Sequence, residues 1–226
     1  ALATQAMSGY WLGMVFYALQ IYLDFSAYSD MAIGMGRMIG FHYLENFDHP
    51  YQCSSVKDFW RRWHISLSSF FRDYVYFPLG GSRCSQTEYI RNMAVVWFLT
   101  GLWHGASWNY ILWGLYFLGF LLLERFVIQD RLPKPLSHLF ALLVVLVGWV
   151  LFKFESFSDL GSVLVGMIGA NGAGFTNLAV NTVFLQNVFL LAVSMLACTG
   201  LGSWLRKRLS SLGGTSDIAV RFFGAL

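Results

Sequence analysis

Charged side chains are scarce in this sequence: Asp, Glu, Lys and Arg make up 12% of its 226 residues, against about 25% in ordinary soluble domains. Hydrophobic residues make up 57%. This balance excludes an ordinary soluble globule. Residues 10–23, 92–123, 135–152 and 160–205 contain no Asp, Glu, Lys or Arg. Since a helix needs about 20 mostly apolar residues to cross a bilayer, these runs predict an all-α, polytopic integral membrane protein.

Cysteine is also rare. The three cysteines are Cys53, Cys84 and Cys198, and no two of them form a CxxC pair. An odd number without metal-binding spacing indicates neither a disulfide framework nor a zinc site. We therefore expect no metal and no permanently bound cofactor. The 15 Lys and Arg residues occur in clusters and leave a net charge of only +3, which indicates membrane topology and no nucleic-acid partner.

The uncharged runs predict a single membrane domain over residues 1–226. A first span over about 7–23 continues into a polar stretch over 24–41 that still has a helical pattern. Further transmembrane helices are expected over about 136–152 and 181–205. The domain is therefore expected to consist of helices throughout.

The uncharged run 92–123 is long enough for a hairpin of one short and one long helix, with His104 near the join. Residues 160–180 hold an apolar piece that is too short to span. The chain begins at Ala1, and no cation precedes Arg37, so the charged start of a signal peptide is absent. We expect the chain to be the C-terminal portion of a longer protein.

Apolar residues recur at spacings of 4 and 3 across residues 56–77. They are Val56, Trp60, Trp63, Leu67, Phe70, Tyr74 and Phe77. This spacing predicts one stripe of an amphipathic helix. The segment carries too many charges for a lone span, so we expect it at the membrane interface or against the protein's own cavity wall.

The cations define an expected topology. They cluster within residues 37–91, 125–134 and 206–208, which fall on one side of the predicted spans, with Lys153 as the exception. By the positive-inside rule this side is cytoplasmic. The assignment requires the run 92–123 to cross the membrane and return.

His104 is an isolated ionisable residue within FLTGLWHGASWNYILWG (98–114). An ionisable group at membrane depth is costly and marks a functional site or a substrate pathway. Helical spacing puts its imidazole between two aromatic residues and beside a small one, namely Trp97, Trp108 and Gly101. A neutral imidazole there can accept a proton from a hydroxyl. The alternative is a packing histidine that donates one hydrogen bond to a carbonyl of a neighbouring helix.

His64 lies on the polar side of the predicted amphipathic helix. The polar stripe of that helix contains Lys57, Arg61, His64, Ser68 and Arg72. Three cations beside one histidine form an anion-binding surface and should lower the proton affinity of the histidine. The phosphates and pyrophosphate of coenzyme A suit such a surface. The alternative is a basic stripe that faces lipid phosphates.

A third polar cluster surrounds Asp24 and Asp30, at or near membrane depth. Its other members are Ser26, Tyr28 and Ser29. Arg37 follows Asp30 by two turns on roughly the same face. Such carboxylates either pair with a cation in a structural role or line a hydrated cavity, and both interpretations remain open. His138 is expected near an interface, where a histidine needs no special role.

Three segments are recognisable in combination: YLDFSAYSDMAIGMGRMIGF (22–41), FWRRWHISLSSFFRDYVYFPLGGSR (59–83) and GLWHGASWNYILWG (101–114). Together they closely resemble the membrane-bound O-acyltransferase family, in particular its bacterial alginate O-acetyltransferase branch, continuously over about 20–125. The stretch YFPLGGSR favours this branch over the related D-alanyl transferases. Residues 126–226 agree with the family in hydropathy only.

The resemblance implies a helical bundle around a tunnel through the membrane. It also implies that His104 is the family's essential histidine and His64 its second signature position. The acyl donor would enter from the cytoplasm and the acceptor from the opposite side. In this branch the implied donor is acetyl-CoA, and the acetyl group passes to periplasmic acetyltransferase partner proteins that modify a polysaccharide.

The residues and the resemblance both indicate acyl transfer, since a thioester reaction needs a hydroxyl, a base and a site without bulk water. We expect a lipid-embedded, multi-pass O-acyltransferase of the bacterial inner membrane that acts indirectly on a polysaccharide. His104 and His64 are the expected catalytic residues. The expected acetyl-CoA-binding residues are Lys57, Arg61 and Arg72. The alternatives are D-alanyl or other acyl transfer from a carrier protein, and a non-enzymatic membrane conduit.

Overall fold

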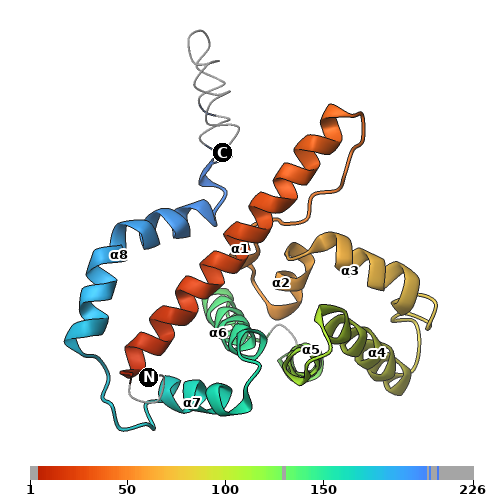
Figure 1. Ribbon diagram of the computed structural model, residues 1–226. Coiled ribbons are helices and arrows are strands. Elements are labelled where there is room, and N and C mark those ends of the chain that lie inside the picture. Colours follow the sequence, from red (N-terminus) through yellow and green to blue (C-terminus); the bar gives the residue numbers. More distant parts are fainter. Residues whose placement is uncertain (1–4, 129–130, 203, 205–207, 209–226) are drawn as a thin grey trace.

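The computed structural model describes residues 5–202 apart from 129 and 130, together with 204 and 208, and within these residues it contains helices and no strand (Figure 1). The prediction of an all-α protein is therefore confirmed. The α-helices are α1 (Met7–Met38), α2 (Val56–Arg62), α3 (Ile65–Phe71), α4 (Gln86–His104), α5 (Trp108–Leu123), α6 (Lys134–Lys153), α7 (Phe157–Met167) and α8 (Leu178–Ala197). Shorter helical turns are η2 (Pro50–Gln52), η3 (Arg72–Tyr76) and η4 (Glu124–Ile128).

Three of these helices are long and apolar enough to cross a membrane: Trp108–Ile128, which joins α5 and η4, then α6 and α8. Helices thus occupy the predicted span 136–152 and most of the predicted span 181–205. The end of the latter span and the cations at 206 and 207 lie outside the described residues. The first predicted span, 7–23, is helical but is not among the three.

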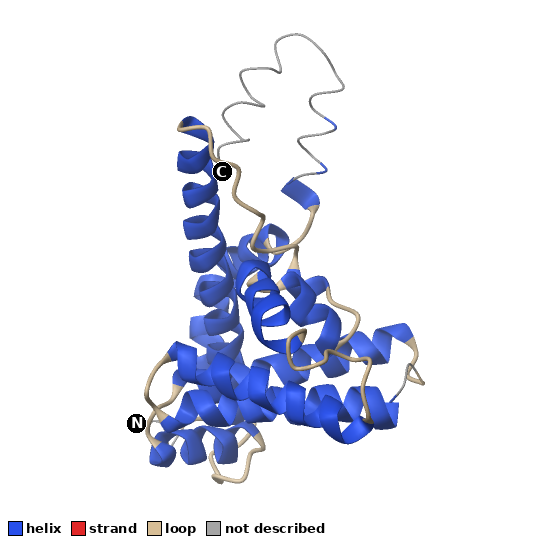
Figure 2. Cartoon of the chain, turned by 90° about the vertical axis from the view of Figure 1, so that its right-hand side faces the viewer, coloured by secondary structure: helices blue, strands red, loops and turns tan. Residues whose placement is uncertain are grey.

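α1 is one continuous helix of 32 residues, so the first predicted span and the polar stretch after it form a single element. In Figure 2, a quarter turn from Figure 1, α1 stands upright and most of the other helices lie across it. Its N-terminal half packs against α6, α7 and α8, and the Trp11 indole N–H donates a hydrogen bond to the Met167 carbonyl at 2.9 Å. The C-terminal half is largely exposed.

α4 and α5 form the predicted hairpin, with the join at residues 105–107. Two glycines allow the two backbones to touch. A Cβ on Gly101 would lie 2.5 Å from the Tyr110 carbonyl oxygen, and a Cβ on Gly114 would lie 2.4 Å from the Trp97 carbonyl oxygen. Gly101 therefore makes room for α5. The small size of Gly101, which the sequence analysis placed beside the His104 imidazole, thus serves the approach of the two backbones.

The core lies where α2 packs against α5 and α6. Its largest fully buried side chains are aromatic: Trp113, Trp149, Phe59 and Phe117. α6 runs antiparallel to α5, since the Tyr116 hydroxyl donates to the Val144 carbonyl at 2.9 Å and the Asn109 amide donates to the Phe152 carbonyl at 3.0 Å. The second contact places the end of α6 beside the hairpin join, and therefore beside His104.

The predicted helix over 56–77 is not continuous. α2 ends at Arg62, and His64 has a left-handed backbone, with φ 47° and ψ 55°, before α3 begins. Residues before the break follow the predicted stripe, because Val56 and Trp63 are buried. After the break the stripe fails: Phe71 is buried, whereas the predicted positions Phe70, Tyr74 and Phe77 are exposed. The left-handed residue changes the direction of the chain and resets which side of the helix faces inward.

α7 has 11 residues, too few to span, as predicted for the segment 160–180. The chain then turns through residues 169–174 and enters α8. The start of α1 is tied to this turn, because the backbone N–H groups of Met7 and Ser8 donate to the carbonyls of Gly174 and Phe175 at 3.1 and 2.8 Å. The start of α1 is therefore held against the turn that precedes α8.

Candidate active site

One pocket of about 230 Å³ lies between the α2–α3–η3 segment and the α4–α5 hairpin. Both histidines that the sequence analysis selected line it, and so do the three selected cations. Its polar lining residues are Lys57, Arg61, His64, Ser68, Arg72, Tyr76, Thr100 and His104. The expectation that the 56–77 segment lies against the protein's own cavity wall is thus met, although the segment is broken into separate helices.

His104 is the last residue of α4, and Gly105 follows it with φ 148°, a backbone conformation that suits glycine. The imidazole lies among aromatic rings: the centroid distances to Trp103, Trp113 and Phe152 are 4.9, 5.0 and 5.1 Å. Within the described part of the chain, neither nitrogen of this ring has a protein hydrogen-bond partner. The alternative of a packing histidine that donates to a neighbouring helix is therefore not what the structure shows.

The aromatic wall around His104 differs from the predicted one. Trp108 belongs to the next helix and is 69% exposed, so it was wrongly placed on the face of His104. Trp113 and Phe152 take its place. Phe152 comes from α6, far along the sequence, and no local spacing in the 98–114 segment could have indicated it.

His64 lies at the break between α2 and α3, and its ring is held on several sides. Its Nδ1 lies 3.2 Å from Oδ1 of Asn46. Phe25 meets the ring edge to face at 4.8 Å, and Trp103, which also touches His104, lies at 5.6 Å. Burial lowers the pKa of His64 to about 4. The predicted direction of this shift is right, but its cause is desolvation and not the neighbouring cations.

The cations of the pocket are not equivalent. Arg72 is paired with the adjacent Asp73, whose Oδ1 lies 2.8 Å from the Arg72 Nε. Among the described residues, the side chains of Lys57 and Arg61 form no ion pair. These two cations are therefore free of a competing carboxylate among the described residues, whereas Arg72 shares its charge with an adjacent exposed one.

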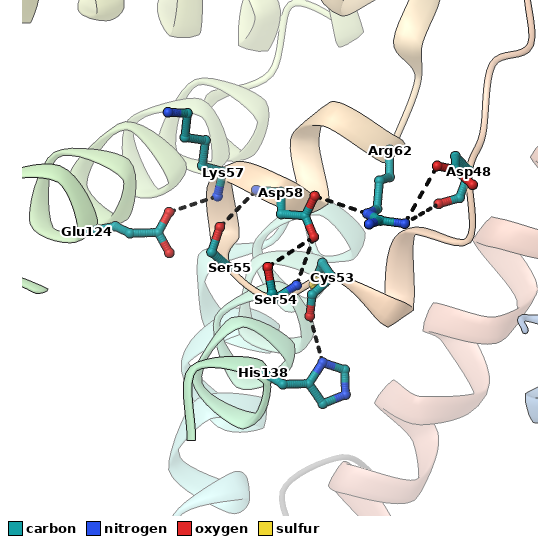
Figure 3. A network of polar contacts seen from close by, with 9 residues as sticks. All are labelled: Asp48, Cys53, Ser54, Ser55, Lys57, Asp58, Arg62, Glu124 and His138. Carbon is teal, nitrogen blue, oxygen red and sulfur yellow. Dashed lines mark hydrogen bonds and ion pairs between the residues drawn. The ribbon is translucent and has the colours of Figure 1, made fainter. Parts of the chain in front are cut away.

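A set of polar contacts fixes α2 at the edge of the pocket (Figure 3). Glu124, the first residue of η4 directly after α5, accepts hydrogen bonds from the backbone N–H groups of Val56 and Lys57 at 3.0 and 2.9 Å. The Ser55 hydroxyl caps the same helix by accepting from the N–H of Asp58 at 3.0 Å. A carboxylate at a helix N-terminus also interacts favourably with the helix dipole. The start of α2 is thus tied to the hairpin that carries His104.

Arg62 has a structural role that its neighbour Arg61 lacks. Its Nε lies 3.0 Å from Oδ1 of Asp58, and its Nη1 lies 3.6 Å from Oδ2 of Asp48 (Figure 3). Partial burial opposes ionisation of Asp58, but hydrogen bonds from Ser54 and Arg62 outweigh it and lower the pKa of Asp58. The Arg-Arg pair of the sequence therefore divides into one residue that faces the pocket and one that anchors α2.

Sequence reasoning missed the roles of three groups around this site. Asn46, in the loop after α1, contacts His64, and Glu124 caps α2. His138, which was assigned no special role, donates from Nδ1 to the Cys53 carbonyl at 2.6 Å and helps to hold the loop before α2 (Figure 3). These partners are 18 to 85 residues apart in sequence, so they carry no periodic signal.

The acidic cluster of α1 lies apart from this pocket. Asp24 and Tyr28 line a second, shallow hollow on α1 together with Tyr17 and Gln20. Arg37 pairs with Glu45 at 3.4 Å, and not with Asp30 as one interpretation required. Cavity lining therefore describes Asp24 better than ion pairing does.

Residues 1–161 match the family described as MBOAT, membrane-bound O-acyltransferase family. The chain belongs to the membrane-bound O-acyltransferase family. The match contains His64, His104 and the cations of the pocket, and it ends within α7. The family resemblance of the sequence is thereby confirmed.

Several relatives of this membrane-bound O-acyltransferase chain carry names that refer to acyl transfer involving alginate, peptidoglycan or teichoic acid. A probable alginate O-acetylase of Azotobacter vinelandii is 43% identical over 201 residues, which is 84% of this chain and 40% of that protein. A peptidoglycan O-acetyltransferase of Helicobacter pylori is 38% identical over 175 residues, 75% of this chain and 33% of that protein. A teichoic acid D-alanyltransferase of Bacillus subtilis is 36% identical over 124 residues, 51% of this chain and 31% of that protein. The chain thus spans about two fifths of the alginate relative's length.

Proposed function

We propose that this chain forms the reaction centre of an O-acyltransferase that moves an acetyl group from cytoplasmic acetyl-CoA across the inner membrane, for O-acetylation of an exopolysaccharide such as alginate. The observation that carries the proposal is the pocket that joins two partly buried histidines to two cations that form no ion pair among the described residues. The names of the relatives support acyl transfer to an envelope polymer.

The proposed reaction transfers an acetyl group from sulfur to oxygen. A ring nitrogen of His104 takes the proton from an acceptor hydroxyl as its oxygen attacks the thioester carbonyl. The carbon–sulfur bond then breaks, an ester forms, and the departing thiolate receives the proton, so that free coenzyme A leaves. The ring nitrogens of His104 are available for this role because they have no hydrogen-bond partner within the described chain. The surrounding aromatic side chains exclude water, which would otherwise hydrolyse the thioester.

Lys57 and Arg61 suit the phosphates of the donor. Both cations line the pocket that also contains the histidines, and Lys57 lies at the edge that Glu124 holds. A donor bound there places anionic groups at the cations and its thioester toward the histidines. Cations that hold phosphates contribute binding, whereas the histidines contribute rate.

The donor side is proposed to be cytoplasmic. Residues 83–90 and 131–134 lie at one end of the α4–α5 hairpin, because α4 starts at Gln86, α5 ends at Leu123 and α6 starts at Lys134. Arg83 lies in the first of these segments, and Arg131 and Lys134 lie in the second, which favours the cytoplasmic side by the positive-inside rule. Single cysteines introduced in each loop of the full-length protein should react with a membrane-impermeant maleimide only after the cytoplasmic face is opened. Labelling of the two loops from opposite faces would contradict the proposed topology.

A second candidate function is D-alanyl or other acyl transfer from a carrier protein, favoured by the identity to the teichoic acid D-alanyltransferase. The proposed acetyl route instead ends on periplasmic acetyltransferase partners that act on the polysaccharide. The two candidates differ in the donor. Binding of acetyl-CoA to the purified full-length protein supports the first, and binding of an acylated carrier protein alone supports the second. Neither function is compatible with a passive conduit, which would leave the donor unchanged.

The test of the proposal is polymer acetylation in cells that express the full-length protein. His104→Ala should abolish acetylation, because loss of a general base costs about 10²–10⁴-fold in rate. His42→Ala is the matched control, since His42 is an exposed loop histidine that does not line the pocket, and it should leave acetylation unchanged. Near-normal acetylation by a well-expressed His104→Ala protein would refute the proposal.

A further inference from the structure

Asn46, in the loop between α1 and η2, makes an unusual number of contacts with the residues that follow the α2–α3 break. Its side-chain Oδ1 accepts hydrogen bonds from the Ser66 backbone N–H at 3.1 Å and from the Ser66 hydroxyl at 2.9 Å. The same oxygen lies 3.2 Å from Nδ1 of His64. Its backbone carbonyl accepts from the N–H of Ile65 at 3.0 Å. One residue thus holds both the backbone and the ring of the His64 turn.

The contact with Ser66 determines which way the Asn46 amide points. A backbone N–H can only donate, so the Asn46 atom that faces the Ser66 N–H must be the oxygen and not the NH₂ group. The alternative orientation would oppose two donors. Since this same oxygen faces His64 Nδ1, the histidine meets an acceptor at that nitrogen.

An acceptor at Nδ1 selects one tautomer of the ring. His64 is partly buried, and the resulting desolvation lowers its pKa and keeps the ring neutral at physiological pH, so only one of its two nitrogens carries a proton. If Nδ1 of His64 were unprotonated, it and Oδ1 of Asn46 would be two acceptors facing each other at 3.2 Å. The Ser66 hydroxyl does not relieve this conflict, because it is closer to Asn46 Oδ1, at 2.9 Å, than to His64 Nδ1, at 3.4 Å. The proton therefore belongs on Nδ1.

We propose that Asn46 is a positioning residue that fixes His64 in the Nδ1–H tautomer and leaves Nε2 as a hydrogen-bond acceptor on the wall of the pocket. Phe25 and Trp103 pack against the ring in T-shaped contacts, so its orientation is set by packing and its proton by Asn46. Under the proposed function, on which this assignment of a role rests, Nε2 accepts a hydrogen bond from a hydroxyl or thiol of a substrate. His104, which has no such partner, is left to carry the proton.

The tautomer is measurable without any turnover. The full-length protein, labelled with ¹⁵N-histidine and held in lipid nanodiscs, would be studied by NMR, and the His64 signals identified by their loss in His64→Gln. In the wild-type protein, Nδ1 of His64 should be protonated and Nε2 unprotonated. Asn46→Asp keeps an acceptor at the same place and should keep this pattern, whereas Asn46→Leu should lose it. Ser66→Ala is the matched control, because it removes the hydroxyl but retains the backbone N–H that orients Asn46.

Activity supplies a second measurement. Asn46→Leu should lower kcat by about tenfold or more with little change in donor KM, because a share of the molecules then presents a protonated Nε2 to the substrate. Ser66→Ala should stay near wild type in both parameters. A protonated Nε2 in wild type, or an unchanged tautomer in a folded Asn46→Leu protein, would overturn the inference. Should Asn46→Leu fail to fold, the wild-type and Asn46→Asp spectra still decide it.

These outcomes are separable from the fate of the proposed function. If His104→Ala retained acetylation while His64 showed the Nδ1–H tautomer, the acyl-transfer assignment would be wrong and the positioning by Asn46 would stand. If His104→Ala abolished acetylation while His64 carried its proton on Nε2, the acyl-transfer assignment would stand and the positioning by Asn46 would be wrong.

Discussion

His64 and His104 line the same pocket, but His64 is held by hydrogen bonds from a loop, whereas His104 is held by aromatic rings at the end of a helix. A hydrogen-bonded nitrogen fixes the proton of its ring, and an unpartnered ring can take or release a proton at a nitrogen that faces a substrate. The side of the pocket formed by α2 and α3 therefore supplies a histidine of fixed tautomer together with the cations. The side formed by the α4–α5 hairpin supplies surroundings that exclude water and the histidine that exchanges a proton.

The largest expected effect tests the aromatic side of this comparison. Trp113 is 1% exposed and touches His104, so Trp113→Ala should lower the free energy of unfolding by about 3 kcal/mol or more, because the lining of the void loses its packing contacts. Trp108→Ala, at a position 69% exposed, should change it by less than about 0.5 kcal/mol. Thermal melts of the full-length protein in detergent would measure both. Equal losses of stability in the two variants would show that Trp113 was wrongly assigned to the aromatic surroundings of His104.

A second prediction concerns the contact that makes the hairpin. Gly101→Ala places a methyl group against the Tyr110 backbone and should destabilise the protein by about 1–3 kcal/mol. Gly119 lies within α5 with open space around it, so Gly119→Ala should be neutral or stabilise by up to about 1 kcal/mol. Chemical denaturation series on both variants would check the contrast. A stable Gly101→Ala protein would mean that the two helices need not touch there.

A third prediction separates the two neighbouring arginines of the polar wall. Arg61→Gln should raise the donor KM by about tenfold, equivalent to about 1.4 kcal/mol, with little change in stability, since its side chain faces the pocket. Arg62→Gln should instead lower the melting temperature, because it breaks the contacts with Asp58 and Asp48. The KM difference should shrink at high salt as charges are screened. If the two variants behaved alike, the pocket would not be the donor site.

The smallest expected effect concerns Arg72. Asp73→Asn removes the partner that neutralises this arginine and should lower the donor KM by roughly two- to threefold, within the range of an exposed ion pair. Combining it with Arg72→Gln should cancel the gain. Titrations of the full-length variants with acetyl-CoA would measure this. If the lower donor KM persisted in the double variant, the effect of Asp73→Asn would not act through Arg72.

Much of the fold could be predicted from the sequence because it depends on local hydropathy. The hairpin of 92–123, the helix at 136–152 and the short piece after residue 160 follow from runs of apolar residues, which need no knowledge of distant partners. The polar stripe also placed Lys57, Arg61 and Arg72 on one pocket, although the helix that was expected to carry them is broken at His64.

The rest depends on contacts between distant segments and on one backbone conformation. Histidine tolerates the left-handed region better than most residues, but nothing local required it at position 64. Asn46, Glu124 and Phe152 reach the site from other elements, and only the folded chain brings them there. The wrong placement of Trp108 has the same origin, because helical spacing was carried across a join where α4 had already ended.

The most direct test of the two-histidine pocket measures donor binding and acetyl transfer separately in the purified full-length protein. Wild type and His104→Ala would be titrated with acetyl-CoA and then followed in single-turnover transfer of a radiolabelled acetyl group. We expect His104→Ala to bind the donor within about twofold of wild type and to transfer acetyl at least about 100-fold more slowly. Acetyl transfer by His104→Ala at a rate close to wild type would contradict the role of His104 as the general base.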